Sequence, residues 1–193
     1  SVAALMETIG SGAVTAPFAE AENSEVIIVI GANPTVNHPV AATFIKNATK
    51  AGSKLIVMDP RGQALSRHAT HMIQFKPSSD VAMLNGMINT IIEESLYDQQ
   101  YVDGFTEGFE ELKNSTKEFT PERMSAICGI KPDTIRKMAR IYAKAESALI
   151  FWGMGVSQHT HGTDNARCLI SLALICGHVG RAGSGLHPLR GQN

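Results

Sequence analysis

Several features that define common classes of protein are scarce or missing in this chain of 193 residues. Its 3 cysteines include no CxxC pair, so we expect no metal site built from this chain alone. The longest apolar run, residues 169–176, is far too short to cross a bilayer, so no membrane span is predicted. The net charge of -1 and the lack of a basic stripe argue against nucleic acid as a partner. A GxxxxGK(S/T) phosphate-binding loop is also absent.

The composition is that of a globular domain. Apolar residues make up 44% of the chain and charged residues 18%, which argues against a disordered chain. The length suits one domain with a full hydrophobic core. Cys168 and Cys176 fall in an apolar helical stretch and are interpreted as small buried side chains. Unpaired cysteines favour a reducing compartment, so a cytoplasmic location is predicted.

Two apolar runs with a helix between them give the first architectural signal. Residues 25–30 (EVIIVI) and 54–58 (KLIVM) have the pattern of strands buried on both faces. Residues 40–51 have helical spacing and stop at Gly52. The apolar face predicted for this helix holds Val40, Ala41, Phe44, Ile45 and Ala48. A strand–helix–strand unit implies a parallel sheet with a right-handed crossover.

The rest of the chain continues this alternation. Further strands are predicted at residues 71–75 and 148–152, and further helices at 1–10, 80–96 and 162–179. Residues 97–145 are predicted to be all helical, while the tail from Gly180 shows no periodicity. The predicted fold class is therefore α/β: a doubly wound, mainly parallel, Rossmann-like sheet with flanking helices and a helical insertion around 97–145.

Polar and small residues gather where the predicted strands end, and such ends lie along one edge of a parallel sheet. Asp59 and Asp80 suit the donors of a guanine or a ribose, and Arg61 suits a phosphate. Structural alternatives remain open, because Asp80 is also a good helix cap and Arg61 a candidate for a surface ion pair. The GxGxxG-like start at Gly153 has Gln158 in the last position, so a nicotinamide site is disfavoured.

No catalytic constellation emerges from spacing alone. The 7 histidines do not cluster by any metal-ligand rule, and no pair of carboxylates suggests acid–base catalysis. His38 is interpreted as a turn residue, and His159 and His161 as solvated or capping residues. No metal ligand is assigned.

Five blocks together carry a family resemblance: IGANP (30–34) with HP (38–39), IVMDPR (56–61), TEGFE (106–110), WGMGV (152–156) with Gln158, and LHPLRGQN (186–193). On these blocks the chain resembles the catalytic subunit of molybdenum- or tungsten-dependent formate dehydrogenases, in the dimethyl-sulfoxide-reductase superfamily. The resemblance covers essentially all 193 residues. The last block is specific to formate dehydrogenases and close relatives.

The resemblance implies that residues 1–193 form a single α/β domain within a larger catalytic subunit. This domain would hold one molybdopterin guanine dinucleotide of a bis-MGD centre that carries molybdenum or tungsten. The metal-ligating cysteine or selenocysteine would lie just before Ser1, and the iron–sulfur cluster in another domain. Implied partners are formate, the other domains of the subunit and iron–sulfur electron-transfer subunits. The isolated fragment is expected to be inactive.

The resemblance also assigns roles to residues. Arg190 would bind formate, since a planar guanidinium holds a carboxylate bidentately, and Gln192 would lie near the metal. The residues implied to contact the cofactor are Gly31, Asn33, Met58, Asp59, Arg61, Ser79, Asp80, Met154, Gln158 and Gly191. Two alternatives remain: a non-catalytic scaffold relative in an electron-transfer complex, and a stand-alone nucleotide-binding module. The electron acceptor and the choice of metal stay open.

Overall fold

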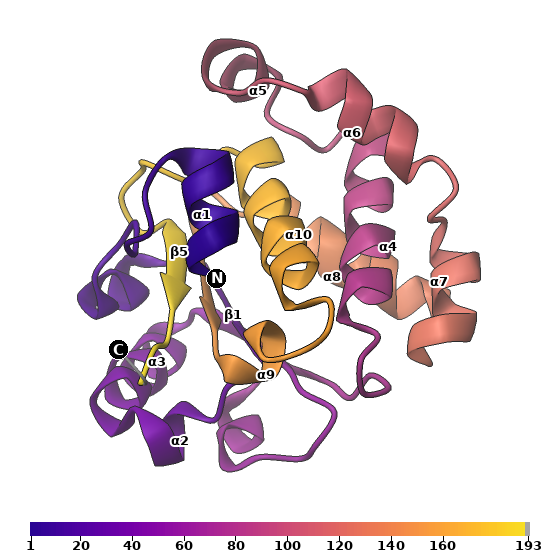
Figure 1. Cartoon of the computed structure of the whole chain (residues 1–193). Coiled ribbons are helices and arrows are strands. Elements are labelled where there is room, and N and C mark those ends of the chain that lie inside the picture. The colour runs from indigo at the N-terminus through magenta and orange to yellow at the C-terminus, as the bar shows by residue number, and fades with distance from the viewer. Residues whose placement is uncertain (192–193) are drawn as a thin grey trace.

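The chain forms a five-stranded parallel sheet in a computed structural model that describes residues 1–191 (Figure 1). The strand order is β3-β2-β1-β4-β5. β1 lies at the centre, with Val26 opposite Lys54 of β2 and Ala148 of β4. The strands are β1 (Val26–Ile30), β2 (Lys54–Met58), β3 (His71–Ile73), β4 (Ala148–Trp152) and β5 (Gly185–Pro188).

Helices cover both faces of the sheet, which confirms the predicted α/β class. Alternate residues of β1 point to opposite sides: Ile28 packs into one core and Ile27 into the other. Both are fully buried, which explains why this strand is apolar at every position. The first core is covered by α1 (Val2–Ile9), α4 (Asp80–Glu93) and α10 (Gly162–Ile175), and the second by η1 (Phe18–Asn23), α3 (Pro39–Ala51) and η2 (Ala64–His68).

The predicted helical insertion is confirmed, and in Figure 1 α5 and α6 lie at the top of the view and α7 at the right, beyond α4. The side chain of Thr120 accepts a hydrogen bond from the Arg123 amide and so caps α7. The buried amide of Asn89 donates to the Thr116 carbonyl at 3.0 Å and joins α6 to α4. The four helices are α5 (Gln99–Phe105), α6 (Phe109–Thr116), α7 (Pro121–Cys128) and α8 (Pro132–Ala143).

The largest correction concerns the tail, where β5 pairs with β4 although no strand was predicted. Every residue of β5 is buried. Its outer edge is closed by Thr15, whose hydroxyl accepts from the Leu186 amide and whose amide donates to the Leu186 carbonyl. A strand reading Gly-Leu-His-Pro has little intrinsic strand propensity, so this long-range pairing decides its conformation.

Other corrections are smaller. Val40 is 66% exposed because it lies in the first turn of α3, away from the sheet. The third strand ends at Ile73, α4 at Glu93 and α10 at Ile175, each short of its predicted end. Two short helices were not predicted, α2 (Pro34–Asn37) and α9 (Met154–Ser157). Across residues 1–191, no helix has the length and apolar character needed to cross a membrane.

Candidate functional site

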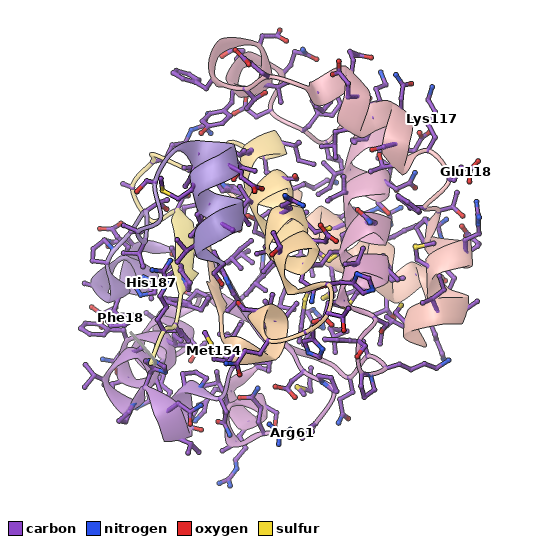
Figure 2. All side chains as sticks on the ribbon, viewed as in Figure 1. Phe18, Arg61, Lys117, Glu118, Met154 and His187 are labelled. Carbon is purple, nitrogen blue, oxygen red and sulfur yellow. The ribbon has the colours of Figure 1, made fainter. Side chains whose placement is uncertain are left out.

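A cavity of about 780 Å³ opens at the carboxyl ends of β1, β2 and β4. β2 and β4 flank β1 on opposite sides, so this is the point where open α/β sheets bind ligands. Figure 2 shows two lining residues, Arg61 and Met154, on the lower side of the molecule, toward which β5 runs in Figure 1. The lining residues are Gly31, Ala32, Asn33, Asn37, His38, Asp59, Pro60, Arg61, Pro77, Ser78, Asp80, Gly153, Met154, Gly155, His159, Leu189 and Gly191.

Two glycines that line this cavity, Gly153 and Gly155, are required by close backbone packing, which the sequence alone does not show. A Cβ added to Gly155 would lie 2.6 Å from the Gly31 carbonyl oxygen, and one added to Gly153 would lie 2.7 Å from the same atom. The Gly155 amide donates to that oxygen at 3.0 Å. These glycines therefore let the turns after β1 and β4 pack backbone against backbone.

The turn after β2 is organised by the buried carboxylate of Asp59, which is 6% exposed. One of its oxygens accepts from the Arg61 amide at 2.8 Å and the other from the Gln63 side chain at 3.2 Å. Gln63 also donates to the Ala32 carbonyl at 2.8 Å, which ties this turn to the one after β1. Each Asp59 oxygen keeps a further lone pair for a ligand.

Asp80 is the second carboxylate of the cavity and is only 2% exposed. It occupies the first turn of α4, with Ser79 rather than Asp80 in the N-cap position. Burial raises the pKa of Asp80, the positive potential of His159 opposes this rise, and the negative charge of Asp59 adds to it. A ligand that offers hydrogen-bond donors would relieve this unfavourable burial of negative charge.

The remaining polar groups of the cavity suit the phosphate and the ribose of a nucleotide. The Asn33 side-chain oxygen accepts from Thr35 at 2.7 Å, which leaves its amide nitrogen to donate toward the cavity. Arg61 is exposed and makes no ion pair with any residue in 1–191, so its charge is free for a phosphate. Two carboxylates for a guanine edge and one guanidinium for a phosphate therefore fit a guanine nucleotide.

Residues 189–191 border the cavity, and the Arg190 guanidinium lies on the side of this segment away from the cavity. Leu189 and Gly191 line the cavity, but Arg190 does not. Its guanidinium donates through Nη2 to the Gly12 carbonyl, while its Nε is buried without a hydrogen-bond partner among the described residues. Within residues 1–191 it also forms no ion pair. A partly buried guanidinium in this state is suited to a small anion.

Ser1 lies beside this guanidinium. The Ser1 hydroxyl accepts from the Trp152 indole at 2.8 Å and forms a 2.5 Å hydrogen bond with Ser157, so Ser1 is held at the end of β4. Ser1 is near enough to Arg190 for the positive charge of the guanidinium to act on its backbone nitrogen. Ser1, the end of β4 and Arg190 are thus close together.

The cavity contains most of the predicted cofactor residues: Gly31, Asn33, Asp59, Arg61, Asp80, Met154 and Gly191. Met58, Ser79 and Gln158 do not line it. Met58 is buried in β2, and the Ser79 hydroxyl donates to the Lys76 carbonyl at 2.5 Å. Gln192 lies outside the described residues. The roles of all these residues stay predictions.

Several residues that line the cavity were not predicted from the sequence to contact a ligand. His38, read as a turn residue, and His159, read as solvated or capping, both line the cavity, as do Asn37, Ser78 and Leu189. His38 and Asn37 fall just after the β1 turn, so closeness to a strand end was the available signal. Residues 1–191 contain no group of three or more histidine, cysteine or acidic side chains placed to hold a metal ion.

The fold and the cavity are those of an α/β domain that binds a nucleotide-like ligand at the switch point of a parallel sheet. Residues 2–190 match the molybdopterin oxidoreductase family. Because this match covers nearly the whole chain, the chain belongs to the molybdopterin oxidoreductase family.

Formate dehydrogenases are among its relatives. The chain is 43% identical to formate dehydrogenase H of Escherichia coli and 42% identical to the F420-dependent formate dehydrogenase subunit alpha of Methanocaldococcus jannaschii. Both alignments cover 100% of this chain but only 27% and 29% of those proteins. Acetylene hydratase from Pelobacter acetylenicus superposes with a TM-score of 0.79 at 28% identity, covering 94% of this chain and 26% of that one. Family membership alone therefore does not fix the reaction.

Proposed function

We propose that this chain is a molybdopterin-guanine-dinucleotide-binding domain of a formate dehydrogenase catalytic subunit, with formate bound by Arg190. The single observation that carries the formate assignment is the Arg190 guanidinium, whose Nε is buried without a partner among the described residues. The relatives at 42–43% identity favour formate dehydrogenation over the hydration named for the structural neighbour at 28%.

The cavity supports the dinucleotide part of the proposal. Asp80 and Asp59 offer acceptors to the N1–H and the amine of a guanine, and Arg61 and Asn33 offer donors to phosphate or ribose. Gly191 lines the cavity in open space, with no atom within 4 Å of an added Cβ. The chain from Leu189 to Arg190 would then lead from the nucleotide toward the reacting end of the cofactor.

The reacting centre would lie on the Arg190 side. The resemblance puts the metal-ligating residue just before the position of Ser1, and Ser1 lies beside Arg190. When bound, the metal–pterin group would supply the acceptor for the two electrons of the formate C–H bond, while carbon dioxide and a proton are released. The role of this chain is to hold the carboxylate in one orientation by two parallel hydrogen bonds from Arg190.

Parts of the proposal lie beyond this chain. Iron–sulfur clusters in other domains or subunits would carry the electrons onward. The free thiols, Cys128, Cys168 and Cys176, favour a reducing compartment, so we place the protein in the cytoplasm. A non-catalytic scaffold relative is the second candidate. Arg190 disfavours it, because its guanidinium forms no ion pair among residues 1–191 and a scaffold needs no group that binds an anion. A stand-alone nucleotide module would use the cavity but leave Arg190 without a ligand.

Nucleotide titration of the cofactor-free protein tests the proposal, with GDP as the probe and NAD and ATP as comparison ligands. We expect GDP to bind most tightly and Asp80→Asn to weaken GDP about tenfold or more, since a charged acceptor is lost. Asp103→Asn, on the exposed side of α5, is the matched control and should bind GDP as the wild type does. Binding of NAD in preference to GDP would contradict the proposal.

A further inference from the structure

The strip formed by residues 189–191 separates the cavity from the Arg190 guanidinium. Two hydrogen bonds fix its backbone. The Leu189 amide donates to the Trp152 carbonyl at 2.7 Å, which continues the pairing of β5 with β4. The second is 3.0 Å long and joins the His38 imidazole Nε2 to the Arg190 carbonyl.

His38 lines the cavity but does not belong to the sheet. It ends α2 and begins α3, and its own amide donates to the Pro34 carbonyl at 3.0 Å. A backbone carbonyl only accepts, so the His38 Nε2 carries the hydrogen and donates. Because His38 also lines the cavity, a single residue borders the ligand space and holds the backbone of Arg190.

We propose that His38 is a positioning residue that couples occupancy of the cavity to the placement of the Arg190 guanidinium. This inference rests on the proposed function, because it assumes a nucleotide in the cavity and an anion at Arg190. Because Asn37, His38 and Gly191 all line the cavity, a ligand bound there would contact both the α2–α3 junction and the strip. A bound ligand therefore limits the motion of the α2–α3 junction, which carries His38. Through the hydrogen bond from His38 to the Arg190 carbonyl, it also limits the motion of Arg190.

The coupling matters because Arg190 has few other restraints. Among residues 1–191, its side chain has one hydrogen-bond partner, the Gly12 carbonyl, and Gly12 lies in a loop without regular structure. Its backbone is held from one side by β4 through Leu189 and from the other by His38. Loss of the His38 bond leaves the strip attached on one side only. The guanidinium would then sample orientations in which it cannot hold a carboxylate with both arms.

The first test compares His38→Ala, His38→Gln and the exposed control His68→Gln in the cofactor-loaded enzyme. We expect His38→Ala to raise the KM for formate about five- to tenfold, the effect of one lost hydrogen bond. Its dinucleotide content, measured after release from the protein, should stay near the wild-type level. His38→Gln should recover most of the loss, since an amide N–H can donate to the same carbonyl. An unchanged KM in His38→Ala, or no recovery in His38→Gln, overturns the proposal.

The second test does not depend on formate. Amide hydrogen exchange of residues 186–191 is followed in the cofactor-free protein with and without GDP. We expect GDP to slow exchange at Gly191 at least threefold in the wild type and in His68→Gln, but not in His38→Ala. Equal slowing in His38→Ala overturns the coupling. Slowing in the wild type together with a lack of formate turnover would leave the coupling standing and remove only the proposed reaction.

Discussion

Arg190 is the residue on which the proposed reaction depends. In the cofactor-loaded enzyme, Arg190→Ala should lower kcat/KM for formate by at least about 100-fold, because an oriented charged donor is lost. The cofactor content should change little, since the Arg190 side chain does not line the cavity. Steady-state kinetics and quantification of released dinucleotide measure the two effects.

The matched variant Arg190→Lys keeps the charge but not the planar fork, so it should recover little activity. Arg123→Ala, at an exposed surface ion pair, controls for loss of a positive charge. Wild-type kcat/KM in Arg190→Ala would remove this residue from the mechanism.

Asp80 should give a pH-dependent stability of defined sign. Its pKa is raised by burial, so the folded state binds the proton more tightly than the unfolded state does. The free energy of unfolding therefore falls as pH rises from the unfolded value near 3.8 through the higher folded pKa. Relative to the wild type, Asp80→Asn should gain stability across this window and keep the gain at neutral pH.

Urea unfolding at a series of pH values measures this difference, with Asp103→Asn as the control for loss of one negative charge on the surface. The same Asp80→Asn protein should bind GDP more weakly, so stability and binding should change in opposite directions. A difference between Asp80→Asn and wild type that is constant with pH would show that burial does not penalise the Asp80 charge.

At single positions, the sequence predicted which strand ends border the cavity better than it predicted which side chain at each end faces it. Asp59, Asp80 and Arg61 follow strands and were assigned to the ligand edge by that fact, and all three line the cavity. Ser79 was assigned to the cofactor, but its neighbour Ser78 is the serine that lines the cavity. Ser78 takes a left-handed φ of 64°, and the Ser79 hydroxyl donates to the Lys76 carbonyl instead. No local pattern announces such a turn, since serine has no marked preference for that conformation.

At the scale of elements, the contact between the turns after β1 and β4 should tolerate no side chain. Gly155→Ala places a methyl group 2.6 Å from the Gly31 carbonyl oxygen, and backbone cannot move away as a side chain can. We expect it to lower the free energy of unfolding by about 1–3 kcal/mol and to weaken GDP binding, because both turns line the cavity.

Gly104→Ala is the matched control. Gly104 lies within α5 with nothing within 4 Å of an added Cβ. This substitution should raise the free energy of unfolding by up to about 0.5–1 kcal/mol, as expected for alanine in a helix. Denaturant unfolding of both variants measures the contrast. Equal stability of Gly155→Ala and the wild type would contradict the close packing of the two turns.

The elements that the sequence predicted well are those with a strong local signal. β1, β2 and β4 are apolar at nearly every position, and α3, α7 and α8 end or begin at proline, glycine or a capping threonine. β5 lacks such a signal. It is a strand because β4 offers an open edge on one side and Thr15 closes the other, and both partners are far away in the sequence. Only the tertiary fold supplies that information.

At the scale of the whole molecule, the thiols should report global unfolding. Burial raises the pKa of Cys128 and of Cys176, and it raises the pKa of Cys168 to about 12. Because the thiolate is the reactive form, all three should react slowly with a disulfide reagent at neutral pH while the protein is folded. In guanidinium chloride, all three should react quickly.

The rate of modification at increasing denaturant measures this contrast, and three single Cys→Ala variants identify each thiol. Cys168 is the least buried of the three, so it should be the first to react when α10 opens locally. Fast modification of Cys128 or Cys176 in the native protein would contradict their burial.

The central position of β1 has a consequence for synthesis of the chain. β2 and β3 follow β1 closely and can pair with one of its edges early, whereas β4 leaves the ribosome only after the whole helical insertion has been made. Until then the other edge of β1, apolar on both faces, is open to pairing with another nascent chain. The length of the insertion thus sets how long this edge of β1 stays unpaired during synthesis. In that interval the helices of the insertion can fold, because their contacts are local.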